Sequence, residues 1–163
     1  LFLGSGTHQV SLQAEAEALG VARQVQCLGG VPSDQVAGHV RTLDVLVNPS
    51  LTLHRGKTRW KEQFGRSIAE GMACGVPVAG SDSGEIPHLI GDAGLVAAEG
   101  DAVALAGCLQ RLMDSPDLRR DLGRRGRERV LQHFTQHRVA ADTYECYRQV
   151  LGITEPALAG APA

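Results

Sequence analysis

The sequence predicts an α/β fold in which helices flank a parallel β-sheet, and two patterns carry this prediction. Short apolar runs that begin or end near glycine or proline alternate with helical stretches, which is typical of the strand–helix units of a parallel sheet. From Asp101 onwards the pattern becomes wholly helical, with Leu105, Leu109 and Leu112 at helical spacing. We therefore expect the C-terminal third of the chain to pack on the sheet as helices.

Five short segments are predicted as strands because they are apolar, as strands covered on both faces should be. They are residues 1–3, 25–28, 45–47, 77–79 and 95–97. Helices are predicted in the intervening segments from the apolar spacing, from Gly and Pro positions and from the N-cap candidate Ser33. They cover about residues 10–19, 33–42 and 67–73 and a segment from Asp101, followed after the break at Ser115-Pro116 by two more helices that end near Leu151.

Composition and charge limit what the chain can bind. Its 163 residues suffice for one domain with a full core, and a formal net charge of −2 offers no global attraction to nucleic acid or to an anionic bilayer. The four cysteines form no CxxC pair, which indicates free thiols in a reducing compartment, so we expect a cytoplasmic protein. Among the six histidines, His133 and His137 lie four positions apart, but a helix boundary is expected between them at Phe134-Thr135, so we expect no metal site. No apolar run reaches the length of a membrane span.

The two ends of the sequence differ in character. The segment Leu1-Phe2-Leu3 has the pattern of a buried strand already under way and lacks an initiator methionine, so we expect a larger protein to precede residue 1. Residues 1–151 are predicted to form one domain. The tail, residues 152–163, is rich in alanine, proline and glycine, and we predict that it is disordered because it has little to bury.

The most informative feature is the pair of glutamates Glu62 and Glu70, set eight positions apart and followed by the strand predicted at residues 77–79. Gly65, between them, permits a turn into the helix that carries Glu70. Free N–H groups at the start of that helix favour an anion such as a diphosphate. The carboxylate of Glu70 can accept both hydroxyls of a ribose, while Glu62 faces the opposite end of the diphosphate. The segment therefore predicts a site for two polyols joined by a phosphate bridge.

Two further segments are rich in charged side chains. The loop from Asn48 to Arg66 is long for this architecture, and we expect it to belong to the site. Before Glu62 it contains His54, Arg55, Lys57, Arg59, Trp60 and Lys61. The segment 119–129 holds six arginines against Asp121 and Glu128, and we interpret it as a solvated helix face with local ion pairs in preference to a membrane-docking surface.

Three stretches together resemble the C-terminal, nucleotide-sugar donor-binding domain of GT-B glycosyltransferases of the retaining family 4 type. They are Leu3 to Gly6, Glu62 to Val78 with its E-x7-E pattern, and Ser81 to Pro87 followed by Ile90 to Leu95. The resemblance covers residues 1 to about 151 and implies a Rossmann-like parallel sheet that lacks its first βα unit. It also implies that the acceptor-binding N-terminal domain is absent from this chain.

The resemblance implies a role for each residue of the motif. Glu62 would be the catalytic residue and would hold the donor hexose, Glu70 would bind the ribose, and Val31 would lie where the family contacts the base. The other substrate-binding residues would be Gly4, Gly6, Gln63, Phe64, Gly65 and Arg66. The substrate would be a UDP-, GDP- or ADP-sugar, and the hexose would be transferred with retention and without a metal or other cofactor.

The resemblance leaves the acceptor open as a saccharide, a lipid or a small molecule. Because the acceptor domain and the family's basic pair on the diphosphate lie outside this sequence, we expect the chain alone to transfer no sugar. Its location would be cytoplasmic, either free or peripheral to the inner face of the membrane. Two other functions fit the sequence less well: a nucleotide-sugar 2-epimerase of similar fold, and a non-catalytic module that binds a nucleotide or a partner.

Overall fold

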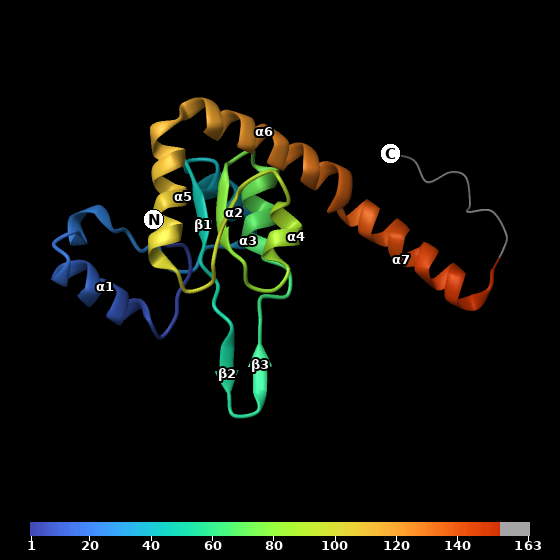
Figure 1. Ribbon diagram of the computed structural model, residues 1–163, viewed down its shortest axis with the longest axis horizontal. Helices are drawn as coiled ribbons and strands as arrows, with labels where there is room; N and C mark the ends of the chain where they lie inside the picture. The colour runs from blue at the N-terminus through green and yellow to red at the C-terminus, as the bar shows by residue number, and fades with distance from the viewer. Residues whose placement is uncertain (154–163) are drawn as a thin grey trace. The chain divides into compact units, whose positions relative to one another are not determined.

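The computed structural model describes residues 1–153, with the exception of the Arg55 side chain. Nearly all of the tail predicted to be disordered, residues 152–163, lies outside the described residues. The chain divides into two compact units, Leu1–Thr42 and Leu43–Ala163, which we describe separately (Figure 1). A single domain over residues 1–151 therefore stays a prediction.

The first unit contains the helices α1 (Gln9–Ala18) and α2 (Ser33–Val40) and a 3₁₀ turn, η1 (Ala22–Gln24). The two segments predicted as its strands meet only in isolated bridges, Phe2 with Cys27 and Gly4 with Gly29. The first helix agrees with the prediction, but Ser33 is not the N-cap of α2. Pro32 takes that place because its ψ of 145° lies outside the helical range, and no side chain caps the helix.

The second unit contains a parallel sheet of three strands in the order β1-β4-β5, with β4 in the centre. The strands are β1 (Leu46–Asn48), β4 (Val78–Ser81) and β5 (Leu95–Ala97), close to the predicted ranges. Its helices are α3 (Arg66–Ala73), α4 (Ile86–Ile90), α5 (Ala102–Asp114), α6 (Pro116–His133) and α7 (Gln136–Leu151). A parallel sheet flanked by helices confirms the predicted fold class.

Both faces of the central strand β4 are covered. On one face Ala79 packs in a cluster with Leu112 of α5 and Leu122 of α6. On the other face a Cβ at Gly80 would lie 2.7 Å from Ile86 of α4 and 3.2 Å from Ile68 of α3, so the glycine allows these helices to approach the sheet closely. All four residues of β4 are buried, which explains why they are small and, apart from Ser81, apolar.

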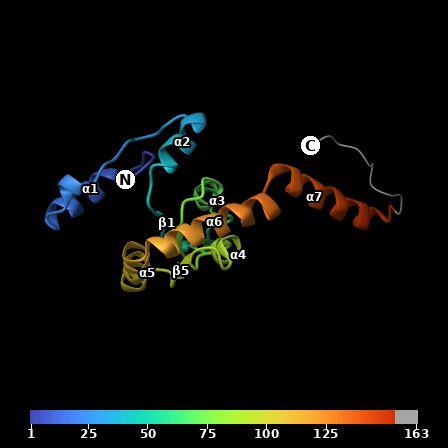
Figure 2. The same ribbon diagram turned by 90° about the horizontal axis from the view of Figure 1, so that it is seen from above.

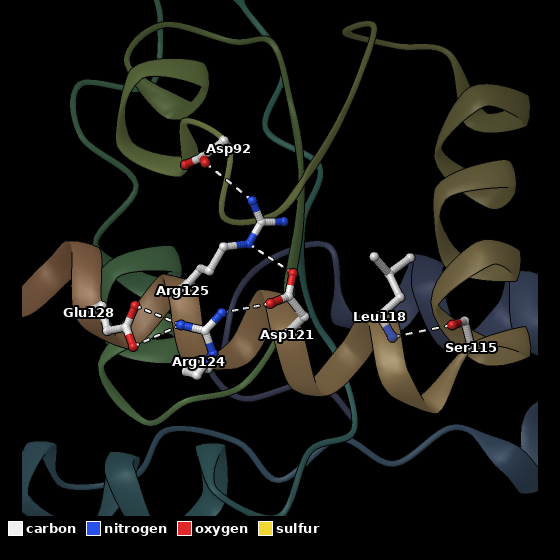
Figure 3. Close-up of polar contacts among 7 residues, drawn as sticks. All are labelled: Asp92, Ser115, Leu118, Asp121, Arg124, Arg125 and Glu128. Atoms are coloured by element: carbon white, nitrogen blue, oxygen red, sulfur yellow. Dashed lines mark hydrogen bonds and ion pairs between the residues drawn. The ribbon is translucent and has the colours of Figure 1, made fainter.

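Helix α6 packs against α3 (Figure 2) and carries the arginine-rich segment. The predicted local ion pairs are confirmed for Arg124, which contacts Asp121 and Glu128, and for Arg125, which bridges Asp121 and Asp92 (Figure 3). The interpretation as a purely solvated face was wrong for three other arginines, which donate to the last carbonyls of neighbouring helices. They are Arg119 toward Leu112 and Met113, Arg127 toward Ala73, and Arg129 toward His88 and Leu89.

Two elements of the second unit were not predicted. One is the five-residue helix α4. The other is an antiparallel hairpin of β2 (Leu53–Arg55) and β3 (Thr58–Trp60), which projects from the sheet and helices of its unit (Figure 1). Among the described residues, no helix has the length and apolar character that a membrane span requires.

Candidate functional site

The main chain and side chain of Glu62 are both fixed. Its carboxylate is half-buried and accepts hydrogen bonds from the Gly65 N–H at 3.1 Å and from the Ser50 hydroxyl at 3.1 Å. Its backbone carbonyl accepts from the Glu85 N–H at 3.2 Å. A Cβ at Gly84 would lie only 1.8 Å from that carbonyl oxygen, so the two loops touch through their backbones. Glu62 is therefore held in one orientation immediately before α3.

Gly65 makes the turn into α3, as its position in the sequence predicts. Its φ of 82° is in the left-handed region, and it is the N-cap of the helix. A Cβ there would lie 3.3 Å from Ile86, so the glycine also lets the turn pack on α4. The Gly65 carbonyl accepts from Ile68 and Ala69. Among the described residues no carbonyl pairs with the N–H groups of Arg66 or Ser67, which lie at the positive end of the helix dipole.

Glu70 lies one turn inside α3 and is exposed. Within the described part of the chain, its carboxylate takes part in no hydrogen bond or ion pair. Two carboxylates thus lie near the start of α3. That of Glu62 accepts two hydrogen bonds, and that of Glu70 accepts none from the described residues. Gln63, Phe64 and Arg66, which the resemblance also assigns to the site, are exposed in the same segment.

A polar network that the sequence did not reveal connects the carboxyl ends of the strands to this helix. Asn48, at the end of β1, donates to Ser67 at 3.0 Å and shares the single Ser50 hydroxyl proton, at 2.7 Å, with Glu62 at 3.1 Å. Ser81, at the end of β4, donates to the Ser50 carbonyl at 2.6 Å. Ligands of open parallel sheets bind beyond the carboxyl ends of the strands, and that rule, applied to Asn48 and Ser81, was the available signal.

Glu99 fixes the beginning of the hairpin segment and was also missed. Its carboxylate accepts from the Thr52 N–H and from the Thr52 hydroxyl, the latter at 2.8 Å. These two hydrogen bonds, that from the backbone first, lower the pKa of Glu99 below its usual range, with a smaller contribution from the positive charge of Lys61. The Glu99 N–H in turn donates to Asp82 at 2.6 Å. The hairpin is thereby tied to the loops that follow β4 and β5.

The remaining predicted binding residues, Gly4, Gly6 and Val31, belong to the first unit. Gly4 has a φ of 127°, and its N–H donates to the Gly29 carbonyl at 2.8 Å in the isolated bridge between these two residues. Whether these residues share a site with Glu62 and Glu70 stays a prediction. The described residues contain no group of three or more His, Cys, Asp or Glu side chains placed to hold a metal ion.

The sheet, its flanking helices and the loops at the strand ends have the architecture of the C-terminal half of a GT-B glycosyltransferase. Sucrose-phosphate synthase from Thermosynechococcus elongatus superposes with a TM-score of 0.76 and 28% identity, over 91% of this chain and 36% of that one. HepE from Anabaena, solved in complex with UDP, superposes with a TM-score of 0.75 over 93% of this chain and 40% of that one, and at 20% identity shows the fold alone.

The profile of the family described as glycosyl transferases group 1 matches residues 1–129, and the chain belongs to this family. A similar curated protein is the 2-deoxystreptamine glucosyltransferase of Streptomyces kanamyceticus, 29% identical over 154 residues. That match covers 93% of this chain but 38% of the relative. The chain thus spans less than half of the length of the curated relatives that it matches. The expected glycosyltransferase class is confirmed at the level of this family.

Proposed function

We propose that the chain is the donor-binding part of a retaining glycosyltransferase of the family 4 type, which transfers a hexosyl group from a UDP-, GDP- or ADP-sugar. The observation that carries this proposal is the arrangement around α3. Glu62 is fixed by the Gly65 N–H and the Ser50 hydroxyl directly before the helix. The N–H groups of Arg66 and Ser67, which have no carbonyl partner among the described residues, follow in the first turn. The Glu70 carboxylate, which makes no hydrogen bond within the described residues, lies one turn further on.

Each part of a nucleotide sugar has a counterpart in this arrangement. The diphosphate would accept from the N–H groups of Arg66 and Ser67, where the helix dipole and the Arg66 side chain oppose its charge. The two ribose hydroxyls would donate to Glu70, because a carboxylate is a pure acceptor. The hexose would lie on the other side of the diphosphate, against Glu62. The presence of UDP in the solved structure of HepE supports a donor of this class.

The chemical contribution of these residues would be orientation of the hexose and stabilisation of the departing diphosphate. Negative charge develops on the leaving phosphate as the glycosidic bond breaks. The N-terminus of α3 and Arg66 are preorganised to stabilise that charge without the participation of a metal ion. Glu62 is a positioning group for the sugar in this account.

The acceptor, a saccharide, a lipid or a small molecule, would bind mainly to an N-terminal domain that is not part of this chain. The matched relatives are more than twice as long as the chain. We place the whole enzyme in the cytoplasm, either free or peripheral to the membrane. The isolated chain would bind the donor nucleotide without transferring sugar.

A calorimetric titration of the chain with UDP, GDP and ADP tests this function. We expect saturable binding of one of the three and at least a tenfold loss of affinity in Glu70→Ala, because hydrogen bonds to a charged group are worth about 1.5–3 kcal/mol. Glu145→Ala, an exposed glutamate on α7, is the matched control and should bind as the unmodified chain does.

Binding that Glu70→Ala leaves unchanged would contradict the assignment of the ribose site. If none of the three diphosphates binds, the donor-binding proposal fails for this chain. The 2-epimerase alternative is separated from glycosyl transfer by an assay of the full-length protein without acceptor, since only an epimerase would convert the nucleotide sugar under that condition.

A further inference from the structure

The hairpin segment between Leu51 and Lys61 concentrates positive charge. It contains Arg55, Lys57, Arg59 and Lys61 and no aspartate or glutamate, although the whole chain has a formal net charge of −2. No ion pair in the described part of the chain involves Arg59 or Lys61. In contrast, each of the six arginines of α6 has an acidic or carbonyl partner (Figure 3 shows two of them). Arg59 and Lys61 are therefore available to a ligand.

The hairpin also exposes apolar surface. Leu53 and Trp60 form a cross-strand pair, and their side chains are 57% and 48% exposed. A two-stranded hairpin of this size is only marginally stable in water without a covering group. An exposed tryptophan offers a flat apolar face to the C–H face of a polyol and an N–H to its oxygens. The surface thus suits a ligand with an anionic group and with a C–H face that can cover the tryptophan.

A pocket of about 490 Å³ lies at the base of this hairpin. The hollow is shallow and open to solvent. It is lined by Arg59, Trp60, Lys61, Glu62, Gln63, Gly84 and Glu85. Glu62, which the proposed function places against the donor hexose, is therefore part of the wall. A molecule in this pocket would lie beside the sugar to be transferred.

We propose that this pocket is an acceptor subsite and that it takes a polyol carrying a phosphate or carboxylate group. Arg59 and Lys61 bind the anionic group, Trp60 covers one face of the polyol, and the hydroxyl that receives the sugar lies toward Glu62. Glu85 accepts from a further hydroxyl. This inference rests on the proposed function, because it is the position of the donor that makes a neighbouring ligand the acceptor.

The tryptophan supplies a specific readout, since Trp60 is the single tryptophan of the sequence. Its fluorescence is recorded while the chain is titrated with glycerol 3-phosphate, glycerate and glycerol. We expect a saturable change with the two anions and none with glycerol. In Arg59→Gln/Lys61→Gln the dissociation constant for the anions should rise at least tenfold, because two charge-assisted hydrogen bonds are lost. Far-UV circular dichroism verifies that each variant is folded.

Lys57→Gln is the matched control, because Lys57 lies in the turn of the hairpin and outside the pocket lining. It should leave the dissociation constant within twofold. The anion titration is repeated with saturating nucleoside diphosphate, which should not displace the anion. Three results would overturn the subsite. They are a fluorescence change with glycerol equal to that with the anions, a loss of anion affinity in Lys57→Gln equal to that in Arg59→Gln/Lys61→Gln, and displacement of the anion by the nucleoside diphosphate. If no nucleoside diphosphate binds while the anions do, the proposed function fails, and the acceptor assignment fails with it.

Discussion

Gly84 determines how closely the two loops of the candidate site can approach. Its φ is +58°, and an added Cβ would lie 1.8 Å from the Glu62 carbonyl oxygen. We expect Gly84→Ala to lower the free energy of unfolding by about 3 kcal/mol, because the Glu62 loop must move and the backbone is strained. Urea denaturation measures the change. Gly107→Ala is the control, since a Cβ at this position of α5 meets nothing and the change favours the helix. Equal stabilities of the two variants would contradict the close approach.

Glu99 predicts a pH dependence of stability. Its pKa is lower in the folded chain than in the unfolded chain, so its stabilising contribution is present above the unfolded pKa and is lost as the pH falls through the folded pKa. We expect Glu99→Gln to have a lower urea midpoint than the unmodified chain at pH 7, and the difference to shrink below about pH 4. Glu15→Gln, an exposed change on α1, should show no such difference. If the urea midpoints of Glu99→Gln and the unmodified chain differ as much at pH 3 as at pH 7, the lowered pKa is contradicted.

At the scale of single residues, the sequence predicted those site residues that lie together in one short segment of the chain. The spacing of Glu62, Gly65 and Glu70 is local, and the left-handed turn at Gly65 appears where the glycine required it. The hydrogen bonds of Ser50, which lies in the loop assigned to the site, and of Glu99 were missed because their partners lie 12 and 47 positions away. Long-range hydrogen bonds leave no periodic trace in a sequence, and only the position of polar residues after the strands indicated them.

At the scale of the elements, helix α6 carries two kinds of arginine. Some donate to carbonyls at the ends of neighbouring helices, and others form exposed ion pairs. Arg129 donates to the Leu89 and His88 carbonyls at the end of α4 at 2.9 and 2.6 Å and lies over the Phe134 ring. Arg120 pairs only with the exposed Asp117. We expect Arg129→Ala to cost about 2 kcal/mol of unfolding free energy and Arg120→Ala less than about 0.5 kcal/mol. Chemical denaturation measures the unfolding free energies of the two variants. Equal losses would show that the hydrogen bonds of Arg129 to the α4 carbonyls do not stabilise the fold.

The elements that sequence reasoning missed are short and lack periodicity. Helix α4 has five residues, so it holds barely one repeat of a helical pattern. The hairpin strands have three residues each, which are too few to show the alternation that marks a strand. The long C-terminal helices were predicted well because Ser115-Pro116 gives a clear start and α5 to α7 each span several turns.

For the whole molecule, the fold class followed from the sequence but the number of strands in one sheet did not. Three of the five predicted strands form the parallel sheet of the second unit, and the segments 1–3 and 25–28 make only isolated bridges. Apolar pattern identifies a segment that is suited to a sheet, but pairing depends on neighbours that are distant in sequence. The contacts of Gly4, Gly6 and Val31 with the nucleotide also depend on residues that are distant in sequence, and they stay a prediction.

The length of the chain relative to its relatives predicts an activity difference. We expect the chain alone to transfer no sugar, while the full-length protein does, because the acceptor subsite proposed here supplies only part of the contacts that hold the acceptor in place for transfer. A radiolabelled nucleotide sugar incubated with each protein and a panel of polyols measures this. Transfer by the isolated chain above the rate without protein would contradict the proposal that most of the acceptor contacts lie outside this chain.

The central claim is that the start of α3 binds a nucleoside diphosphate between Glu62 and Glu70. The most direct test is a crystal structure of the chain with whichever of UDP, GDP or ADP binds. The account predicts that the ribose hydroxyls donate to Glu70 at about 2.5–3.0 Å and that the phosphate oxygens accept from the N–H groups of Arg66 and Ser67. A nucleotide bound elsewhere, or one whose ribose does not contact Glu70, would contradict it.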